Sequence, residues 1–256
     1  MAVVTALAVL VPVGVNTWGQ VNQQTETIST QLHHPVTRLE VSVGDGAATI
    51  RPGRPGQVGI HGAVTWGLFK PVVRLAWTGD TLRITLACGP LAPGLLGDVL
   101  DSGCWGVQLT VTVPAGVPVD AAATAGTVGA RQMTGPLTMR ATSGSVLLTS
   151  DSGPVWARAT SGAITATALT SARVNTALTS GGMSLQFARA PRLVNAAVTS
   201  GAATITVPAG SRYRVRSSVG SGGFRSVAAG LASASAPGLI GLSVDSEGSV
   251  TVGYPG

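Results

Sequence analysis

A short triplet of small, turn-forming residues returns at nearly constant intervals along the second half of the chain. Most copies read T-S-G, and successive copies are 18 to 20 residues apart, starting at Thr124, Thr142, Thr160, Thr179, Thr199 and Ser218. Self-similarity at such a period is typical of chains that fold as stacked coils, in which each repeat contacts only its neighbours. The spacing therefore predicts a single-stranded β-solenoid with about 18–20 residues per coil.

The residue types agree with an all-β fold. Only 10% of the residues are charged and 4% are aromatic, whereas 45% are hydrophobic. The abundant Gly, Ala, Thr, Ser and Val suit short strands and tight turns better than helices. Further turn signals lie about halfway between the triplets, at residues 134–136, 151–153 and 170–172. Each coil is therefore expected to hold two short strands and two turns.

Alternation within the repeats predicts which side chains face the interior, because successive residues of a strand point to opposite sides. Apolar residues recur five positions before each triplet, at Val119, Leu137, Val155, Val174, Val194 and Tyr213. The positions between the apolar columns are predicted to face solvent, and they include Arg140, Trp156, Arg158, Arg214 and Arg216. The triplet glycines are expected to adopt positive φ in turns, and the hydroxyls to bond turn backbone, so the triplet serines are interpreted as structural.

The N-terminus predicts export or anchoring. Residues 1–19 begin with an apolar run from Met1 to Val15, which is shorter than the roughly 20 residues of a membrane span. We interpret this segment as a membrane anchor or signal remnant, shortened by a start codon placed too far downstream, with Trp18 at the outer interface. Residues 20–36 are expected to be a polar tether, and residues 37–256 one ectodomain. A cleaved signal peptide and a buried strand are the alternatives.

The chain has two cysteines, Cys88 and Cys104, which bracket a segment rich in Gly and Pro. An even count in an exported chain predicts one disulfide, which would contribute about 3 kcal/mol in the chain-entropy model. Two buried free thiols are the alternative. Zinc binding is disfavoured because the three histidines stand apart from both cysteines in sequence.

A second duplication carries a resemblance to a known family. Residues 106–126, GVQLTVTVPAGVPVDAAATAG, match residues 201–220, GAATITVPAGSRYRVRSSVG, with V-P-A-G in register. With the apolar leader and the T-S-G-x-V coils, the chain resembles the DUF4097 family, the adhesin-like or toastrack proteins of bacterial envelopes. The resemblance implies a β-solenoid or β-roll outside a membrane, often beside membrane sensors, with no established catalytic residues. The segment from Cys88 to Cys104 and the short leader depart from that pattern.

The residue types give little support to the hypothesis that this chain is an enzyme. Carbohydrate-active enzymes on β-helices need paired or metal-binding carboxylates, whereas residues 121–244 contain one acid, Asp151, in a turn signal. A Ser-His-Asp site could use only His61 or the histidines before it. The glycines at 220–223 lack the Lys-Ser/Thr of a phosphate loop. We therefore expect no catalytic residues, metal or cofactor, and a carbohydrate-active enzyme remains the alternative.

The charge pattern points to an anionic partner. The net charge of +6 comes from arginines and a single lysine, Lys70, without a basic run, which disfavours nucleic acid binding. Stacking should make Arg140 and Arg158 neighbours beside Trp156, with Arg214 and Arg216 farther along, as a possible anion-binding face. A merely solvated surface is the alternative. The sequence predicts a non-catalytic, adhesin-like or envelope-sensing module, single-pass in the cell membrane with its domain on the extracytoplasmic side, or else secreted. Its partner would be an envelope protein or an anionic cell-wall or lipid component.

Overall fold

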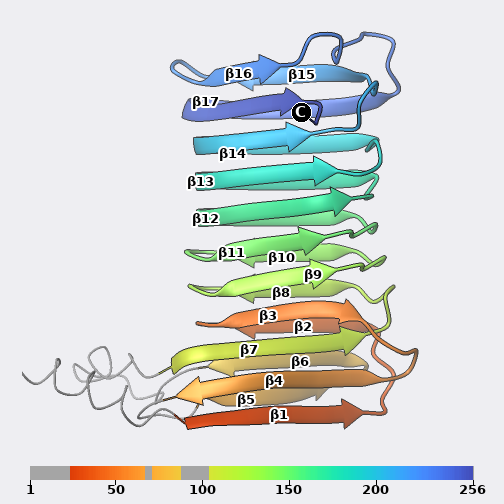
Figure 1. Ribbon diagram of the computed structural model, residues 1–256, viewed down its shortest axis with the longest axis vertical. Coiled ribbons are helices and arrows are strands. Elements are labelled where there is room, and N and C mark those ends of the chain that lie inside the picture. Colours follow the sequence, from red (N-terminus) through yellow and green to blue (C-terminus); the bar gives the residue numbers. More distant parts are fainter. Residues whose placement is uncertain (1–23, 67–70, 88–103, 256) are drawn as a thin grey trace, which may run out of the picture.

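The computed structural model describes residues 24–66, 71–87 and 104–255 (Figure 1). These residues form 17 strands and no helix, so the predicted all-β class is confirmed. Among them, no helix is long and apolar enough to cross a membrane. The anchor expected at 1–19 lies outside the described residues. The disulfide expected between Cys88 and Cys104 does so too, because Cys88 is not described.

The strands are stacked along one long axis in two layers (Figure 1). The layers share four long strands, β12 (Val155–Leu169), β13 (Arg173–Phe187), β14 (Leu193–Thr206) and β17 (Gly238–Gly253), which run from one layer into the other. The first layer holds their first halves together with β5 (Val72–Thr78), β6 (Thr81–Ala87), β2 (Arg38–Val43), β8 (Val119–Ala123), β10 (Leu137–Ala141) and β15 (Tyr213–Val219). The second layer holds their second halves together with β1 (Gln24–Leu32), β4 (Val58–Trp66), β7 (Cys104–Val113), β3 (Ala47–Pro52), β9 (Thr127–Arg131), β11 (Ser145–Thr149) and β16 (Phe224–Val227).

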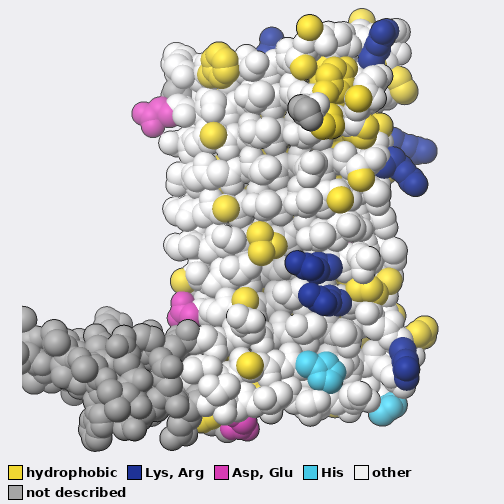
Figure 2. Space-filling view, viewed as in Figure 1, with side chains coloured by type: hydrophobic (Ala, Val, Ile, Leu, Met, Phe, Trp, Pro, Cys, Tyr) yellow, Lys and Arg dark blue, Asp and Glu magenta, His cyan; other side chains and the backbone are white. Residues whose placement is uncertain are grey.

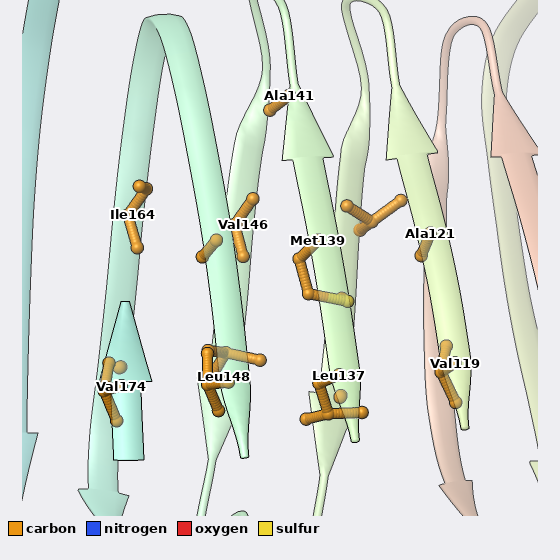
Figure 3. Packing of buried hydrophobic residues seen from close by; sticks show 14 of the residues in the cluster. Val119, Ala121, Leu137, Met139, Ala141, Val146, Leu148, Ile164 and Val174 are labelled. Atoms are coloured by element: carbon orange, nitrogen blue, oxygen red, sulfur yellow. The ribbon is translucent and has the colours of Figure 1, made fainter. Parts of the chain in front are cut away.

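From β8 to β14 the strands pair in parallel at the predicted spacing. Val155 lies between Leu137 and Val174, and Val174 pairs in turn with Val194. All four side chains are at most 2% exposed, as the column assignment requires. The second layer closes the interior with Val146, Leu148 and Ile164, which are equally buried. Figure 3 shows medium-sized side chains from both layers meeting in this narrow core beside alanines such as Ala121 and Ala141.

The triplets join the two layers differently from the expectation. In β12, β13 and β14 the ladder continues through them, with Ser161 paired to Ser180, so the triplet bends one long strand and does not separate two short ones. At Gly144 and Gly162 φ is not positive. A Cβ on either residue would lie 1.8 Å from the carbonyl oxygen of the glycine one coil earlier. These glycines are therefore needed for the close approach of coils, and positive φ is found farther along, at Gly181.

The N-terminal end departs from regular stacking. Residues 24–32, part of the expected tether, form β1, which pairs antiparallel with β4 over its whole length. The pairs β4–β7 and β5–β6 are antiparallel as well. The tether assignment is thus corrected for these residues: their alternating polar side chains build an edge strand, because one face of an edge strand can remain in water.

The C-terminal end also departs from the expected order. Strand β17 pairs with β14 on one side and with β15 and β16 on the other, so the last strand of the chain lies inside the stack and not at its end. The sixth copy of the triplet, at Ser218, therefore does not stack on the fifth. Val194 is followed in its row by Ile240 and then by Val215, and Tyr213 pairs with Gly238. Because of this insertion, the described residues from β8 to β17 do not form one uninterrupted single-stranded coil.

Candidate functional site

The outer surface of the first layer carries a shallow groove of about 470 Å³ across β12, β13, β14, β17 and β15. We call it the Trp156 groove. It is lined by Trp156, Arg158, Asn175, Thr176, Ala177, Asn195, Ala196, Ala197, Arg216, Ser217, Ser218, Gly241, Leu242 and Ser243. No Asp or Glu belongs to this described lining.

Strand register sets the shape of the Trp156 groove. One row across the strands consists of Trp156, Asn175, Asn195, Gly241 and Arg216. The neighbouring row consists of Arg158, Ala177, Ala197, Ser243 and Ser218. Small side chains in the middle of both rows leave the surface low between Trp156 and Arg158 at one end and Arg216 at the other. Four strand spacings of about 4.8 Å make this distance about 19 Å, the length of a short polymer segment.

Arg140 and Arg158 pair directly across β10 and β12, so the structure places them side by side. Their guanidinium carbons lie 5.1 and 5.5 Å from the centre of the Trp156 ring, within the range of cation–π attraction. Arg140 also bonds Asp120, with Nη1 2.5 Å from Oδ1. Asp120 therefore places a negative charge beside Arg140. No ion pair joins Arg158 to any described carboxylate.

The ion pairs on this surface end at Asp120. Arg83 Nη2 lies 2.7 Å from Glu40, and Arg38 lies 3.6 Å from Glu40 and 3.7 Å from Asp120. Farther along the stack, the sequence has no Asp or Glu between Asp151 and Asp245. The Trp156 groove thus lies beyond Asp120, the last carboxylate that forms an ion pair on this surface. Its two arginines are therefore not neutralised within the described part of the chain.

Two asparagines occupy the middle of the groove. Asn195 Nδ2 donates to Asn175 Oδ1 at 2.8 Å, which fixes both amides across adjacent strands. Gly241 makes room for them, because a Cβ there would lie 2.6 Å from Asn195 Oδ1. Neither asparagine was predicted as a site residue. Their recurrence at the same position of successive coils was the available signal.

Of the other predicted arginines, Arg216 lines the groove and Arg214 does not. Arg214 is exposed two residues earlier in β15, where it pairs with Leu239. The predicted alignment put Arg214 in the asparagine row, but the inserted β17 and a shift of two residues put Arg216 there. The structure therefore brings together Arg140, Trp156 and Arg158, places Arg216 across the groove, and leaves Arg214 outside.

Residues considered for catalysis lie elsewhere. Asp151 is fully buried in a turn, where it accepts hydrogen bonds from the backbone N–H of Met133 at 2.8 Å and of Thr149 at 3.1 Å. Burial raises its pKa to about 6, against the lowering effect of these bonds. The Ser29 hydroxyl lies 3.1 Å from His61 Nδ1 on an exposed surface, and no described carboxylate bonds that ring. No group of three or more described His, Cys, Asp or Glu residues could hold a metal.

The second layer presents a different outer surface. Figure 2 shows that surface, where uncharged side chains cover most of β11, β12, β13 and β14. Its central row runs through Leu147, Thr165, Ser184, Thr204 and Thr251. Arg131, which pairs with Thr149, is exposed on this surface. The two surfaces thus differ in both charge and relief.

Comparisons with known proteins give a likeness of fold. No family model matches the chain, and no curated protein matches it. An adhesin candidate from Bacteroides fragilis is 13% identical with a TM-score of 0.55, over 89% of this chain and 97% of that one. An adhesin candidate from Parabacteroides merdae is 13% identical with a TM-score of 0.48, over 90% and 96%. A candidate cell adhesion protein from Clostridium sporogenes is 11% identical with a TM-score of 0.37, over 91% and 100%. Of these three, the structure from Bacteroides fragilis has a TM-score above 0.5, and at 13% identity its likeness shows the fold alone.

Proposed function

We propose that this chain is a non-catalytic, adhesin-like module of the cell envelope that binds an anionic polymer in the Trp156 groove. In this view its regular coils form a short β-solenoid of the DUF4097 type. Two lines of support are independent of each other. The sequence motifs resemble that family, and the solved structures of similar fold are described as candidates for adhesion.

One observation carries the proposal: the groove holds two arginines without a carboxylate among its lining residues. A guanidinium binds carboxylate or phosphate through parallel hydrogen bonds and keeps its charge at any physiological pH. Trp156 adds a large apolar surface, and the amides of Asn175 and Asn195 add hydrogen-bonding groups between the charges. A polymer with regularly spaced acidic groups fits this order of contacts. A carbohydrate-active enzyme would need paired carboxylates, which the described lining lacks.

The test is binding to immobilised anionic polymers, polyglycerol-phosphate teichoic acid and polygalacturonate, at low and high salt. Arg158→Gln and Arg216→Gln should each weaken binding about 10- to 150-fold, since a charged hydrogen bond contributes about 1.5–3 kcal/mol. Arg131→Gln is the matched control, with the same loss of charge on the surface of the second layer. Equal losses in all variants would reveal nonspecific attraction of a cationic protein and defeat the proposal. So would the absence of binding to both polymers.

We further propose that residues 1–19 tether the module to the membrane as a single-pass anchor, with residues 37–256 on the extracytoplasmic side. The apolar run from Met1 to Val15 motivates this arrangement. Protease added to intact cells should degrade the module while the cells keep a cytoplasmic marker protein. Recovery of the full-length chain, protected from protease, in the cytoplasmic fraction would contradict the tether. A shortened, released chain would instead indicate a cleaved signal peptide.

A further inference from the structure

The N-terminal end of the stack carries two strand edges side by side. Strand β1 ends the second layer and β5 ends the first (Figure 1). Along one edge, β1 pairs with β4 and β5 pairs with β6. No described strand pairs with the opposite edge of either. A free edge presents backbone N–H and C=O groups that can pair with a strand of another chain.

The apolar interior is open at this end as well. Directly opposite residues of an antiparallel pair point to the same face. Leu75 pairs with the buried Ile84, and Thr30 pairs with the buried Ile60, so these positions of β5 and β1 face the interior. Leu75 is nevertheless 38% exposed and Trp77, on the same face, is 36% exposed. The last inward side chains of the stack therefore lack the cover that a further coil would give.

A cleft of about 390 Å³ lies between the two edge strands. It is lined by Glu26, Ile28, Thr30, Ile60, Pro71, Val72, Val73 and Leu75. None of these residues belongs to the Trp156 groove. The cleft is thus a separate apolar surface at the end of the molecule.

The midpoints of the two edge strands coincide at this cleft. Strand β1 has nine residues and is centred on Ile28, and β5 has seven residues and is centred on Leu75. Both central residues line the cleft. A two-fold axis sets a strand that it crosses antiparallel to the same strand of a second copy. One axis through Ile28 and Leu75 therefore pairs both edge strands over their full lengths.

We propose that this end is a dimer interface, in which β1 and β5 pair antiparallel with β1 and β5 of a second copy of the chain. The axis sets Leu75 against the partner's Leu75 and Ile28 against the partner's Ile28. On the inner face, Val73 lies opposite the partner's Trp77. An aromatic side chain opposite a β-branched one is a stabilising cross-strand pair. The two open interiors then cover each other.

The charged residues of both strands agree with this register. Arg74 lies opposite the partner's Ala76, and Glu26 lies opposite the partner's Thr30, whose hydroxyl can donate to the carboxylate. Like charges directly opposite each other would be destabilising. Moving the axis by one residue, from Leu75 to Arg74, would set Arg74 against the partner's Arg74. The register that centres both strands is therefore also one that keeps like charges from facing each other.

This dimer would place both Trp156 grooves on one side of the assembly. The axis runs through both layers and maps each layer onto itself, so the outer surfaces of the two first layers face the same way. A single polymer chain could then contact both grooves, which increases its overall affinity without a new kind of contact. The dimer itself does not depend on polymer binding.

The primary experiment is sedimentation velocity of the full chain in a density-matched detergent, over a range of protein concentrations. We expect a monomer–dimer equilibrium without larger species. Leu75→Arg sets two guanidinium groups against each other at the axis and should raise the dissociation constant at least about 100-fold. Leu147→Arg is the matched control, because Leu147 is a similarly exposed leucine, at 44%, on the outer surface of the second layer. Circular dichroism should show that both variants keep the β fold.

A second measurement tests the register without adding charge. In a chain with Cys88 and Cys104 replaced by serine, Leu75→Cys brings two thiols together at the axis, and mild oxidation should link the two copies. Val72→Cys lies three residues from the axis, so its two thiols are about 20 Å apart and should not link. A mixture of Val72→Cys and Thr78→Cys chains should link, because the axis pairs these two positions.

The outcomes decide the proposal. It is overturned if the wild type stays monomeric at all concentrations, if Leu75→Arg dimerises as Leu147→Arg does, or if Leu75→Cys forms no linked dimer. Growth into ever larger species would indicate head-to-tail stacking, and dimers that survive Leu75→Arg would indicate association through another segment, such as residues 1–19. Either result contradicts the two-fold interface. Arg158→Gln should leave the dimer unchanged, so failure here is distinct from failure of the groove.

Discussion

The two ends of the stack differ in whether carboxylates accompany their arginines. Toward the N-terminus, the ion pairs of the described first layer join Arg38, Arg83 and Arg140 to Glu40 and Asp120. From residue 152 to 244 the chain keeps eight arginines and no carboxylate. Yet β2, β6, β8 and β10, which carry these ion pairs, pair in parallel as the later coils do and cover the same kind of apolar interior.

This contrast indicates which interactions hold the stack together. Exposed ion pairs contribute at most about 1 kcal/mol each, so their loss beyond Asp120 costs little stability. The coils after Asp151 are held by buried apolar columns and by close contact between successive backbones. Charge in this part of the molecule is therefore not needed for folding. The Trp156 groove lies here, where arginines are available to a ligand.

The largest effect is expected from a charge placed inside the stack. Val155→Asp would bury a carboxylate between Leu137 and Val174 and should lower the free energy of unfolding by about 4 kcal/mol or more. Trp156→Asp is the matched control, because the same charge one residue later lies on the outer surface beside Arg140 and Arg158. It should cost about 1 kcal/mol. Thermal and urea unfolding of both variants measure the difference.

A reversal of that order would contradict the model of the stack. If Trp156→Asp proved the more damaging change, the two columns would be exchanged by one residue of register. The inward column and the Trp156 groove would then both be wrong. Comparable, small losses would show that charge is tolerated inside, and that the apolar columns are not what holds the acid-free coils together.

The next effect concerns the close approach of coils. Gly144→Ala would place a Cβ 1.8 Å from the carbonyl oxygen of Gly126, so adjacent coils must separate, and we expect a loss of about 3 kcal/mol. Gly182→Ala is the matched control on β13, because nothing lies within 4 Å of a Cβ there. It should change stability by less than about 0.5 kcal/mol. Equal urea midpoints for the two variants would argue against backbone contact as the reason for the repeated glycine.

Much of the regular stack could be predicted from the sequence. The period of 18–20 residues gave the pairing of Leu137, Val155 and Val174, and alternation gave the adjacency of Arg140, Trp156 and Arg158. These features repeat, so one copy of the motif predicts the next. The role of the triplet glycine was misjudged because a local sequence shows turn chemistry but not the distance to the preceding coil.

Features that depend on strand order could not be predicted. The insertion of β17 between β14 and β15 brings Gly241 beside Asn195 and moves Arg216, in place of Arg214, into the groove. It also sets Tyr213 over Gly238. No local pattern distinguishes a strand that ends a stack from one that enters it. The polar β1 was missed because an edge strand with solvated residues resembles a tether in composition.

The last effect depends on pH and concerns Asp151, the last carboxylate before the acid-free stretch. Its pKa is raised from 3.8 to about 6 by burial, so the folded state holds its proton at pH values where the unfolded chain has released it. Stability from this group is complete below about pH 4 and falls as the pH rises to about 6, by up to about 3 kcal/mol. Asp151→Asn removes this titration. From pH 4 to 6 the free energy of unfolding of the wild type should therefore fall relative to that of the variant. Above pH 6 the difference between the two should stay constant. Urea unfolding across this range measures the difference, with Asp80→Asn in an exposed turn as control for losing one carboxylate.

A difference independent of pH would mean that Asp151 ionises as readily in the fold as in the unfolded chain. Its bonds to Met133 and Thr149 would then stabilise the charged form fully. The last carboxylate before the acid-free coils would be buried as an ion and not as a protonated acid.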